Sequence, residues 1–349
     1  MRILSLGAAT MGGALILLTA CSGGSQGSSP VPPGSGTSMA RHSLAELVKT
    51  GIAPKFFPLL RFHRVKNHPL TGVGPRHILV DDAGAADVAV IDNGDWSNDG
   101  TITSGIAGPD GNFVANHSFY EADYVNLEIN EYTHVPGSDW IGSTPSFAYN
   151  SGISDPVDVA VDSNGNVYAA NYNFGSGGAV IEYPQGSNTP IATCTVTGGA
   201  EGVAIDKAGD VFVSEVVSGA GEVVMFTGGL SGCSGTTLPL GSLGYLGGMA
   251  TDGNNNLVVC EQDTATFGAG EVLVVAPPYT SVTGTLGSGY SAPFHVTINK
   301  RNKVAYVADD AAAVVDVLSY PSGSLITQLG SANGLVDPYS AVYGENAVY

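Results

Sequence analysis

The chain contains few basic residues, and this scarcity excludes one class of partner. Among 349 residues, 12 Lys and Arg stand against 31 Asp and Glu, which gives a formal net charge of −19. Binding of nucleic acid needs a basic surface that neutralises phosphates, so we expect no nucleic-acid partner. The bases are also unevenly placed, because seven of the twelve lie between Arg41 and Arg76. The N-terminal arm is therefore basic, and the body that follows is strongly acidic.

Cysteine is also scarce, and no cysteine spacing typical of a metal site occurs among the four cysteines. Cys260 lies in the apolar run NLVVCEQ and should be buried and inert. Cys194 and Cys233 lie near turn-rich segments and are candidates for a disulfide, although the sequence leaves their pairing open. The fourth cysteine, Cys21, belongs to the N-terminal segment.

Long apolar runs are absent beyond the first 21 residues, so no later segment is predicted to span a bilayer. The first run follows Arg2 and ends in LTAC, which closes at Cys21. A positive start, an apolar stretch and small residues at the end are typical of an export signal. The segment resembles the signal of bacterial lipoproteins, which implies cleavage before Cys21 and a lipid on that residue. An ordinary secretory signal with a chance cysteine is the alternative.

Three segments are predicted to precede the body. Residues 1–20 are the signal peptide, and residues 21–40, rich in Ser, Gly and Pro, form a flexible linker after the lipidated Cys21. Residues 41–75 form a basic arm that begins with a short helix. Its aromatic and basic residues either contact anionic lipid or an acidic partner, or pack across the acidic body. We expect the mature protein in the cell envelope, outside the cytoplasm and anchored to a membrane by lipid.

Residues 76–349 lack helical periodicity. Short runs rich in Val, Tyr and Ala alternate with turns of Gly, Asn, Asp and Pro, which predicts an all-β fold. One pattern recurs four times, as DPVDVAVDSNGNVYAANYN, GAEGVAIDKAGDVFVSEVV, YLGGMATDGNNNLVVCEQD and APFHVTINKRNKVAYVADD. Each copy contains two strands around a turn, and a third and a weaker fourth strand follow. Four strands in about 45 residues are typical of a β-propeller blade.

Two weaker units precede these four. In residues 106–150 the run GNFVAN aligns with GNVYAAN, which makes Asn116 the end of a second strand. Residues 76–105 lack a first strand, and the C-terminal DPYSAVYG could supply it and close the ring. We therefore predict a propeller of six four-stranded blades, or of seven if the final GENAVY begins another.

The repeated pattern P-x-x-(V/I)-A-V-D-x-x-G-N-V-Y-(V/A)-A-(N/D) resembles the NHL repeat and its relatives among bacterial extracytoplasmic propellers. The resemblance covers residues 76–349 and implies a central channel, but it does not imply an activity. We expect a monomer that acts as a binding or protein-interaction scaffold. Its ligand would be a protein, a glycan or a small molecule.

The second strands end in polar residues that the resemblance places around the channel. They are Asp81, Asn116, Asn171, Glu215, Glu261 and Asp309. Carboxylate and amide oxygens suit Ca²⁺ or another divalent cation, and they also suit a sugar-like ligand. A water-filled channel lined by polar side chains is the alternative. The segments 162–166 and 252–256 lack the full ligand spacing of an EF-hand and are predicted to be turns.

A second polar set lies near the first strands, where His77, Asp158 and His295 hold related positions and Glu201 comes one place earlier. In sugar-lactone hydrolases of the gluconolactonase type, a Glu near a first strand joins an Asn and an Asp around a divalent metal. Glu201, Asn171 and Asp309 could imitate that trio, so a metal-dependent lactone or ester hydrolase is the alternative function. The strongest parts of that family's pattern are missing, and we assign no catalytic residue.

Overall fold

The computed structural model describes residues 77–135, 139–173, 177–262 and 270–344. Its regular structure consists of strands and three short 3-10 turns, η2 (Ser231–Cys233), η3 (Asp310–Ala312) and η4 (Ser331–Asn333). No helix among these residues is long and apolar enough to cross a membrane. The predicted signal peptide with Cys21, the linker and the basic arm lie outside the described residues.

The strands form six four-stranded antiparallel sheets, which we number as blades 1 to 6. Within a blade, the inner strand comes first and the strand paired with it is the second strand. Blade 1 contains β24 (Pro338–Gly344), β1 (His77–Asp82), β2 (Asp87–Asp92) and β3 (Asn98–Ile102). Blade 2 contains β4 (Pro109–Ala115), β5 (Ser118–Asp123), β6 (Glu128–Thr133) and β7 (Phe147–Tyr149). Blade 3 contains β8 (Pro156–Val161), β9 (Val167–Asn171), β10 (Ala179–Tyr183) and β11 (Ala192–Thr195).

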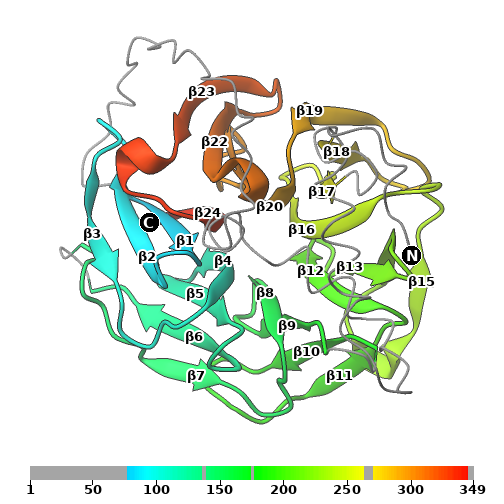
Figure 1. Ribbon diagram of the computed structural model, residues 1–349. Helices are drawn as coiled ribbons and strands as arrows, with labels where there is room; N and C mark the ends of the chain where they lie inside the picture. Colours follow the sequence, from blue (N-terminus) through cyan, green and yellow to red (C-terminus); the bar gives the residue numbers. More distant parts are fainter. Residues whose placement is uncertain (1–76, 136–138, 174–176, 263–269, 345–349) are drawn as a thin grey trace, which may run out of the picture. The chain divides into compact units, whose positions relative to one another are not determined.

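The other three blades follow in chain order. Blade 4 contains β12 (Gly199–Ile205), β13 (Val211–Val217), β14 (Ala220–Phe226) and β15 (Gly235–Thr237). Blade 5 contains β16 (Tyr245–Thr251), β17 (Leu257–Gln262), β18 (Gly270–Val275) and β19 (Gly284–Tyr290). Blade 6 contains β20 (Pro293–Ile298), β21 (Val304–Asp309), β22 (Val314–Ser319) and β23 (Ser324–Leu329). Figure 1 shows the six inner strands gathered around the centre of the ring.

The C-terminal strand closes the ring. β24 pairs antiparallel with β1, with Gly344 opposite His77 and Ala341 opposite Val80. This pairing gives blade 1 the inner strand that residues 76–105 lack, and it leaves β1 paired on both sides. The prediction of six blades closed by the C-terminal strand is confirmed.

Blade 2 corrects one strand assignment. The run GNFVA lies in the inner strand β4 rather than in a second strand, and the second strand is β5. Asn116 and His117 connect the two with backbone φ angles of 48° and 65°. Positive φ at both central residues is the signature of a tight type I′ hairpin turn, which favours Asn. This two-residue turn replaces the longer Asp-to-Asn turn of the other copies, and the similarity of GNFVAN to GNVYAAN therefore misled the alignment.

The core lies between neighbouring blades. Strands such as β9 are buried along their whole length, because each blade is covered on both faces. The aromatic rings of Tyr149 in blade 2 and Tyr183 in blade 3 lie 5.5 Å apart in one such interface. Fully burying one large apolar side chain contributes about 1.5–3 kcal/mol, so the six interfaces together stabilise the ring.

The cysteines divide into a pair and a single thiol. A disulfide joins Cys194 of β11 to Cys233 of η2, and it links blade 3 to the segment that follows β14 of blade 4. The sequence had left this pairing open. Cys260 is free and buried in β17, as expected from its apolar surroundings.

Candidate functional site

All six blades share one irregularity near the start of the inner strand. At this point a polar residue near the end of the second strand faces a Pro, Ala or Leu of the inner strand, and the register then shifts by a bulge. The polar residues at this position are Asp82, Asp123, Asn171, Glu215, Glu261 and Asp309. We call this end of the channel the ring end, and we call the opposite end, where each inner strand turns into the second strand, the hairpin end.

The polar residues of the ring end hold the backbone that leads into each inner strand. Oδ1 of Asn171 accepts the N–H groups of Ser154 at 2.9 Å and Asp155 at 2.8 Å. The carboxylate of Asp309 accepts those of Ser291 at 2.9 Å and Ala292 at 2.7 Å. Such bonds satisfy backbone donors that no strand partner reaches.

The other four blades repeat this bond. Glu215 accepts the N–H of Gly198 at 2.5 Å, and Glu261 accepts that of Gly244 at 2.6 Å. Asp82 and Asp123 each accept two N–H groups in the same way. Each blade therefore has one polar side chain at the ring end that accepts hydrogen bonds from its backbone, and we call these six residues the backbone clamps.

Two residues of the predicted ring, Asp81 and Asn116, lie elsewhere in the structure. Asp81 lies one residue before the clamp position, which Asp82 occupies. Asn116 lies exposed in the hairpin turn of blade 2, at the opposite end of the channel, and Asp123 takes its place in the ring. Asn171, Glu215, Glu261 and Asp309 hold the predicted position. The missed residues had a signal, because SFYEAD and HILVDD both end a run of strand residues in Asp.

Asp81 instead belongs to a buried group between blades 1 and 2. Its carboxylate accepts a hydrogen bond from Ser340 Oγ at 3.0 Å, and Asn112 and Glu121 face each other across β4 and β5 nearby. Burial raises the pKa of Asp81 well above its ordinary value, and burial together with the charge of Asp81 does the same for Glu121. The structure thus favours the protonated form of these carboxyl groups.

A cross-channel hydrogen bond lies just beyond the bulges. His295 Nε2 of blade 6 lies 2.9 Å from Asp158 Oδ1 of blade 3, which stands opposite in a ring of six. The second oxygen of Asp158 accepts the N–H of Val203 in blade 4 at 2.9 Å. Both side chains are buried, at 4% and 1% exposure. The pair therefore braces three blades across the channel.

Glycines at the same level make room for this brace. A Cβ on Gly248 would lie 2.0 Å from Cδ2 of His295, and one on Gly111 would lie 2.5 Å from Oδ1 of Asp158. The prediction that Asp158 and His295 hold related positions agrees with their places in β8 and β20. His77 does not belong with them, because it begins β1, a second strand.

A cavity opens from the brace toward the hairpin end. Its volume is about 510 Å³, and His295 and Asp158 line its inner end. All six inner strands contribute to its wall, through Val114, Val159, Val203, Met249, Thr297 and Val342. A second hollow of about 410 Å³ lies between the hairpin turns of blades 3 to 6 and shares lining residues with the first. The resemblance implied a central channel, but no motif in the sequence marks the residues that line this cavity.

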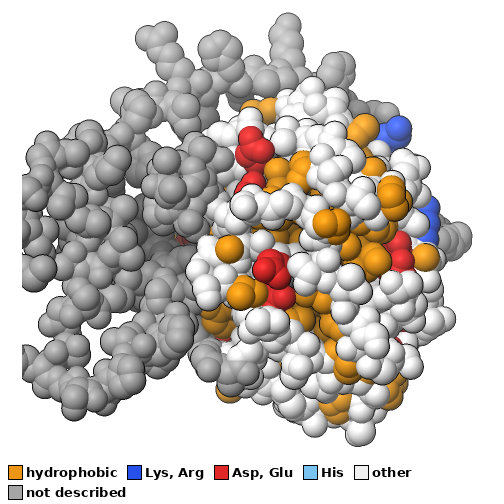
Figure 2. Space-filling model, turned by 90° about the vertical axis from the view of Figure 1, so that its right-hand side faces the viewer, with side chains coloured by type: hydrophobic (Ala, Val, Ile, Leu, Met, Phe, Trp, Pro, Cys, Tyr) orange, Lys and Arg blue, Asp and Glu red, His pale blue; other side chains and the backbone are white. Residues whose placement is uncertain are grey.

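The bases of the described residues gather at the hairpin end. There are four of them, Lys207 in the β12–β13 turn and Lys300, Arg301 and Lys303 in the β20–β21 turn. Lys207 and Lys300 line the second hollow, and Lys207 Nζ donates to the carbonyl oxygen of Gly253 at 2.6 Å. In the side view of Figure 2, the visible Lys and Arg side chains lie at the right-hand edge. A strongly acidic body therefore presents its bases at one mouth of the channel.

The residues of the hydrolase hypothesis have other hydrogen-bond partners. Glu201, Asn171 and Asp309 belong to blades 4, 3 and 6. Glu201 accepts a hydrogen bond from the hydroxyl group of Tyr245, and Asn171 and Asp309 accept backbone N–H groups as described. Within the described residues, the one group of three His, Cys or acidic side chains with ligand atoms within 4.8 Å of one another is His77, Asp92 and Asp99 in blade 1.

Comparison with solved structures agrees with the fold. A nidogen/laminin complex contains a chain with a TM-score of 0.58 and 13% identity, covering 78% of this chain and 100% of that one. A protein of unknown function from Bacteroides caccae gives 0.58 and 11%, covering 77% and 99%. A functionally unknown protein from Desulfotomaculum acetoxidans gives 0.53 and 10%, covering 76% and 98%. These likenesses show the propeller fold alone.

No protein-family model matches the chain, and no curated protein matches it either. The resemblance to NHL repeats therefore stays a prediction, whereas the six-bladed propeller on which it depends is confirmed.

Proposed function

We propose that the chain is a lipid-anchored, extracytoplasmic propeller that binds a small ligand in its channel from the hairpin end. The observation that carries this proposal is the cavity of about 510 Å³ to which all six inner strands contribute. Binding sites for small molecules are concave, largely apolar and of about 300–1,000 Å³, with a few fixed polar groups. The His295–Asp158 brace supplies such polar groups at the inner end of the cavity.

The chemistry of the walls suggests the class of ligand. Aliphatic side chains line the middle of the cavity, and Lys207 and Lys300 lie at the outer hollow. Asp162, Asp206 and Asp252 also line this hollow, but each of these carboxylates accepts backbone N–H groups of its own turn, so we assign the contact with a ligand anion to the two ammonium groups. The ligand that fits is an amphiphile with an apolar body and an anionic head group.

A protein partner at the hairpin turns is the other binding mode that the scaffold role includes. One of the similar structures is a complex of nidogen and laminin, which supports protein binding as a use of this fold. At 13% identity, however, it supports nothing about the surface of this chain. The cavity, to which all six inner strands contribute, is the more specific feature, so we give it priority.

The ligand proposal can be tested with 8-anilinonaphthalene-1-sulfonate, a fluorescent probe with an apolar body and an anionic group. The full chain carrying Cys21→Ser should bind it with saturable fluorescence, because this variant cannot be acylated and needs no detergent. Ala250→Phe, a change at a small, half-buried residue of the cavity wall, should weaken binding at least tenfold. Ala85→Phe, the same change in an exposed turn of blade 1, is the control. Equal binding by both variants would contradict the proposal.

The location can be tested separately by fractionation of cells. The wild-type chain should sediment with membranes and incorporate labelled fatty acid, whereas Cys21→Ser should incorporate none. Fatty acid on the Cys21→Ser variant, or none on the wild type, would contradict the lipid anchor and would leave the ligand proposal untouched.

A further inference from the structure

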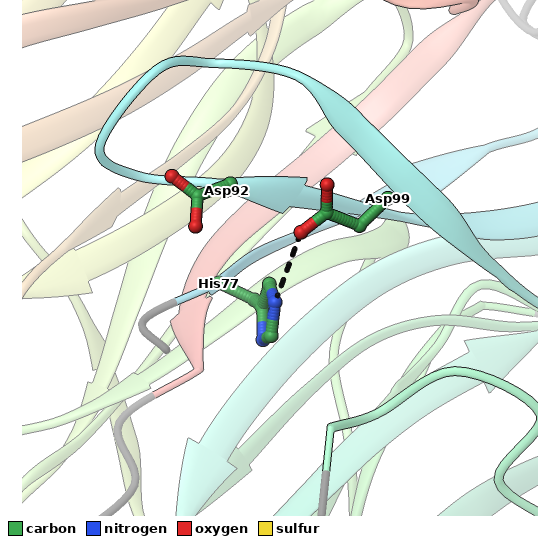
Figure 3. Close-up of side chains that lie close together, drawn as sticks. All are labelled: His77, Asp92 and Asp99. Atoms are coloured by element: carbon green, nitrogen blue, oxygen red, sulfur yellow. Dashed lines mark ion pairs between the residues drawn. The ribbon is translucent and has the colours of Figure 1, made fainter. Parts of the chain in front are cut away.

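A His and two Asp side chains come together on blade 1. They are not among the six clamp residues, and they do not line the cavity. We propose that His77, Asp92 and Asp99 bind a divalent transition-metal cation of the zinc type. Each offers one ligand atom, and these atoms lie within 4.8 Å of one another. Figure 3 shows the imidazole of His77 facing the carboxylate of Asp99, with Asp92 beside them.

The sheet brings these three residues together. His77 of β1 is the direct cross-strand partner of Asp92 of β2, so their side chains leave the same face of the sheet. Asp99 of β3 is the extra residue of a bulge, because Ile91 faces Asn98 and Val90 faces Gly100. A bulge redirects the side chain of its extra residue, and here it lets Asp99 join the other two.

Further hydrogen bonds fix both carboxylates. Oδ1 of Asp92 accepts the N–H groups of Gly94 at 2.5 Å and Asp95 at 3.0 Å. Oδ1 of Asp99 accepts a hydrogen bond from Ser97 Oγ at 3.0 Å. One oxygen of each carboxylate is thus held by the β2–β3 turn, while Oδ2 of Asp99 faces His77. Such outer hydrogen bonds orient the ligands of metal sites.

One distance in the group, whose ligand atoms all lie within 4.8 Å of one another, matches the spacing around a small tetrahedral cation. His77 Nε2 and Asp99 Oδ2 are 3.4 Å apart. Zn²⁺ with bonds of about 2.0–2.1 Å to nitrogen and oxygen separates its ligands by about 3.3 Å. An imidazole in the set favours zinc and its neighbours over Mg²⁺ and Ca²⁺, which prefer oxygen alone. Three protein ligands leave the fourth position for water.

Exposure is graded across the group. His77 is 3% exposed, whereas the side chain of Asp99 is 38% exposed. A cation can therefore reach the exposed carboxylate of Asp99 from solvent and then bind the buried imidazole of His77. Since β1 also pairs with the closing strand β24, the metal would tie three strands of the blade that completes the ring. We infer a stabilising role for it at this closure.

The test uses the full, tag-free Cys21→Ser chain, stripped with chelator and titrated with Zn²⁺ in a calorimeter. We expect one Zn²⁺ bound in blade 1, a higher melting temperature with Zn²⁺, and no comparable effect of Mg²⁺ or Ca²⁺. Asp99→Asn should weaken this binding at least tenfold and abolish the thermal shift. Asp95→Asn removes a carboxylate of the same turn that is outside the group, and it should bind like the wild type.

Two results would overturn the proposal. One is the absence of Zn²⁺ binding by the stripped wild-type chain, which would leave a simple ion pair between His77 and Asp99. The other is equal Zn²⁺ binding and equal thermal shift in Asp99→Asn and Asp95→Asn. Circular dichroism of Asp99→Asn without metal shows whether the variant is folded, and a misfolded variant is replaced by Asp92→Asn in the same comparison. Neither result bears on ligand binding in the cavity.

Discussion

The two ends of the channel differ, because the ring end carries the same polar contact in every blade and the other end does not. At the ring end, every blade places an Asp, Asn or Glu at one register position, and each of these side chains clamps the backbone of its own blade. At the level of the brace and beyond it, the blades differ: blade 6 supplies His295, blade 3 supplies Asp158, and blade 5 supplies a glycine. The polar residues that recur in all blades maintain the fold, whereas His295 and Asp158, which break the repeat, line the cavity.

The hairpin end also contains the positive charges of the described residues, which are scarce in this chain. The described residues contain four bases, all in two hairpin turns, whereas their acids lie at both ends of the channel, including Asp162, Asp206 and Asp252 in the hairpin turns. A ligand-binding function therefore fits the end at which the composition departs from the rest of the chain.

The largest effect should follow removal of the closing strand. A chain that ends before residue 337 lacks β24, so β1 becomes an open edge and blade 1 loses its inner strand. We expect loss of cooperative thermal unfolding in circular dichroism. A chain that ends at Gly344 retains β24 and should unfold like the full chain. If both shortened chains unfolded alike, ring closure by β24 would be wrong.

A large difference should also separate two residues that the sequence placed in one ring. Asp309→Ala leaves two backbone N–H groups without their acceptor and should lower the free energy of unfolding by about 2–4 kcal/mol. Asn116→Ala, in an exposed turn, should cost at most about 1 kcal/mol, mainly because Ala tolerates positive φ poorly. Urea unfolding measures both, and similar losses would contradict the division between the two ends.

The brace should show a moderate effect that depends on its partner. Gly248→Ala places a methyl group against His295 and should destabilise the protein by about 1–3 kcal/mol. In the background of His295→Ala, the same change should cost less, because the clash is gone. A double-mutant cycle measures this coupling, and additive losses would argue against close packing at the brace.

The smallest effect should appear in the dependence of stability on pH. The pKa of Glu121 is raised in the folded state by burial and by Asp81, so its contribution is fully present below its ordinary pKa of about 4.3. That contribution is lost as pH rises through the folded pKa. Glu121→Gln imitates the protonated form, and its stability should fall less steeply than that of the wild type above about pH 4. Parallel pH profiles would contradict the prediction.

Sequence reasoning recovered the blades because their signals are local. Apolar runs around Gly and Asn turns define each hairpin, and DPYSAVYG has the form of an inner strand wherever it lies in the chain. A slip of one residue, however, moves a side chain to the other face of a strand. Asp81 and Asp82 differ by such a slip, and both are Asp, so composition could not choose between them.

The sequence implied a central channel, but the hydrogen bond that crosses it could not be predicted, because it depends on which blades lie opposite each other. His295 and Asp158 are 137 residues apart, and nothing in the sequence around either residue says which blades lie opposite each other. The count of six blades, once fixed by the structure, makes blades 3 and 6 opposite. The tight Asn116–His117 turn likewise became visible only from its backbone angles.

The hydrogen bond between His295 and Asp158 also affects how a ligand could pass along the channel. These two side chains line the cavity and join blades 3 and 6 across the channel, and Gly111 and Gly248 pack against them without room for a Cβ. Under the proposed function, a ligand would enter and leave at the hairpin end, and its occupancy would follow the ligand concentration at that mouth.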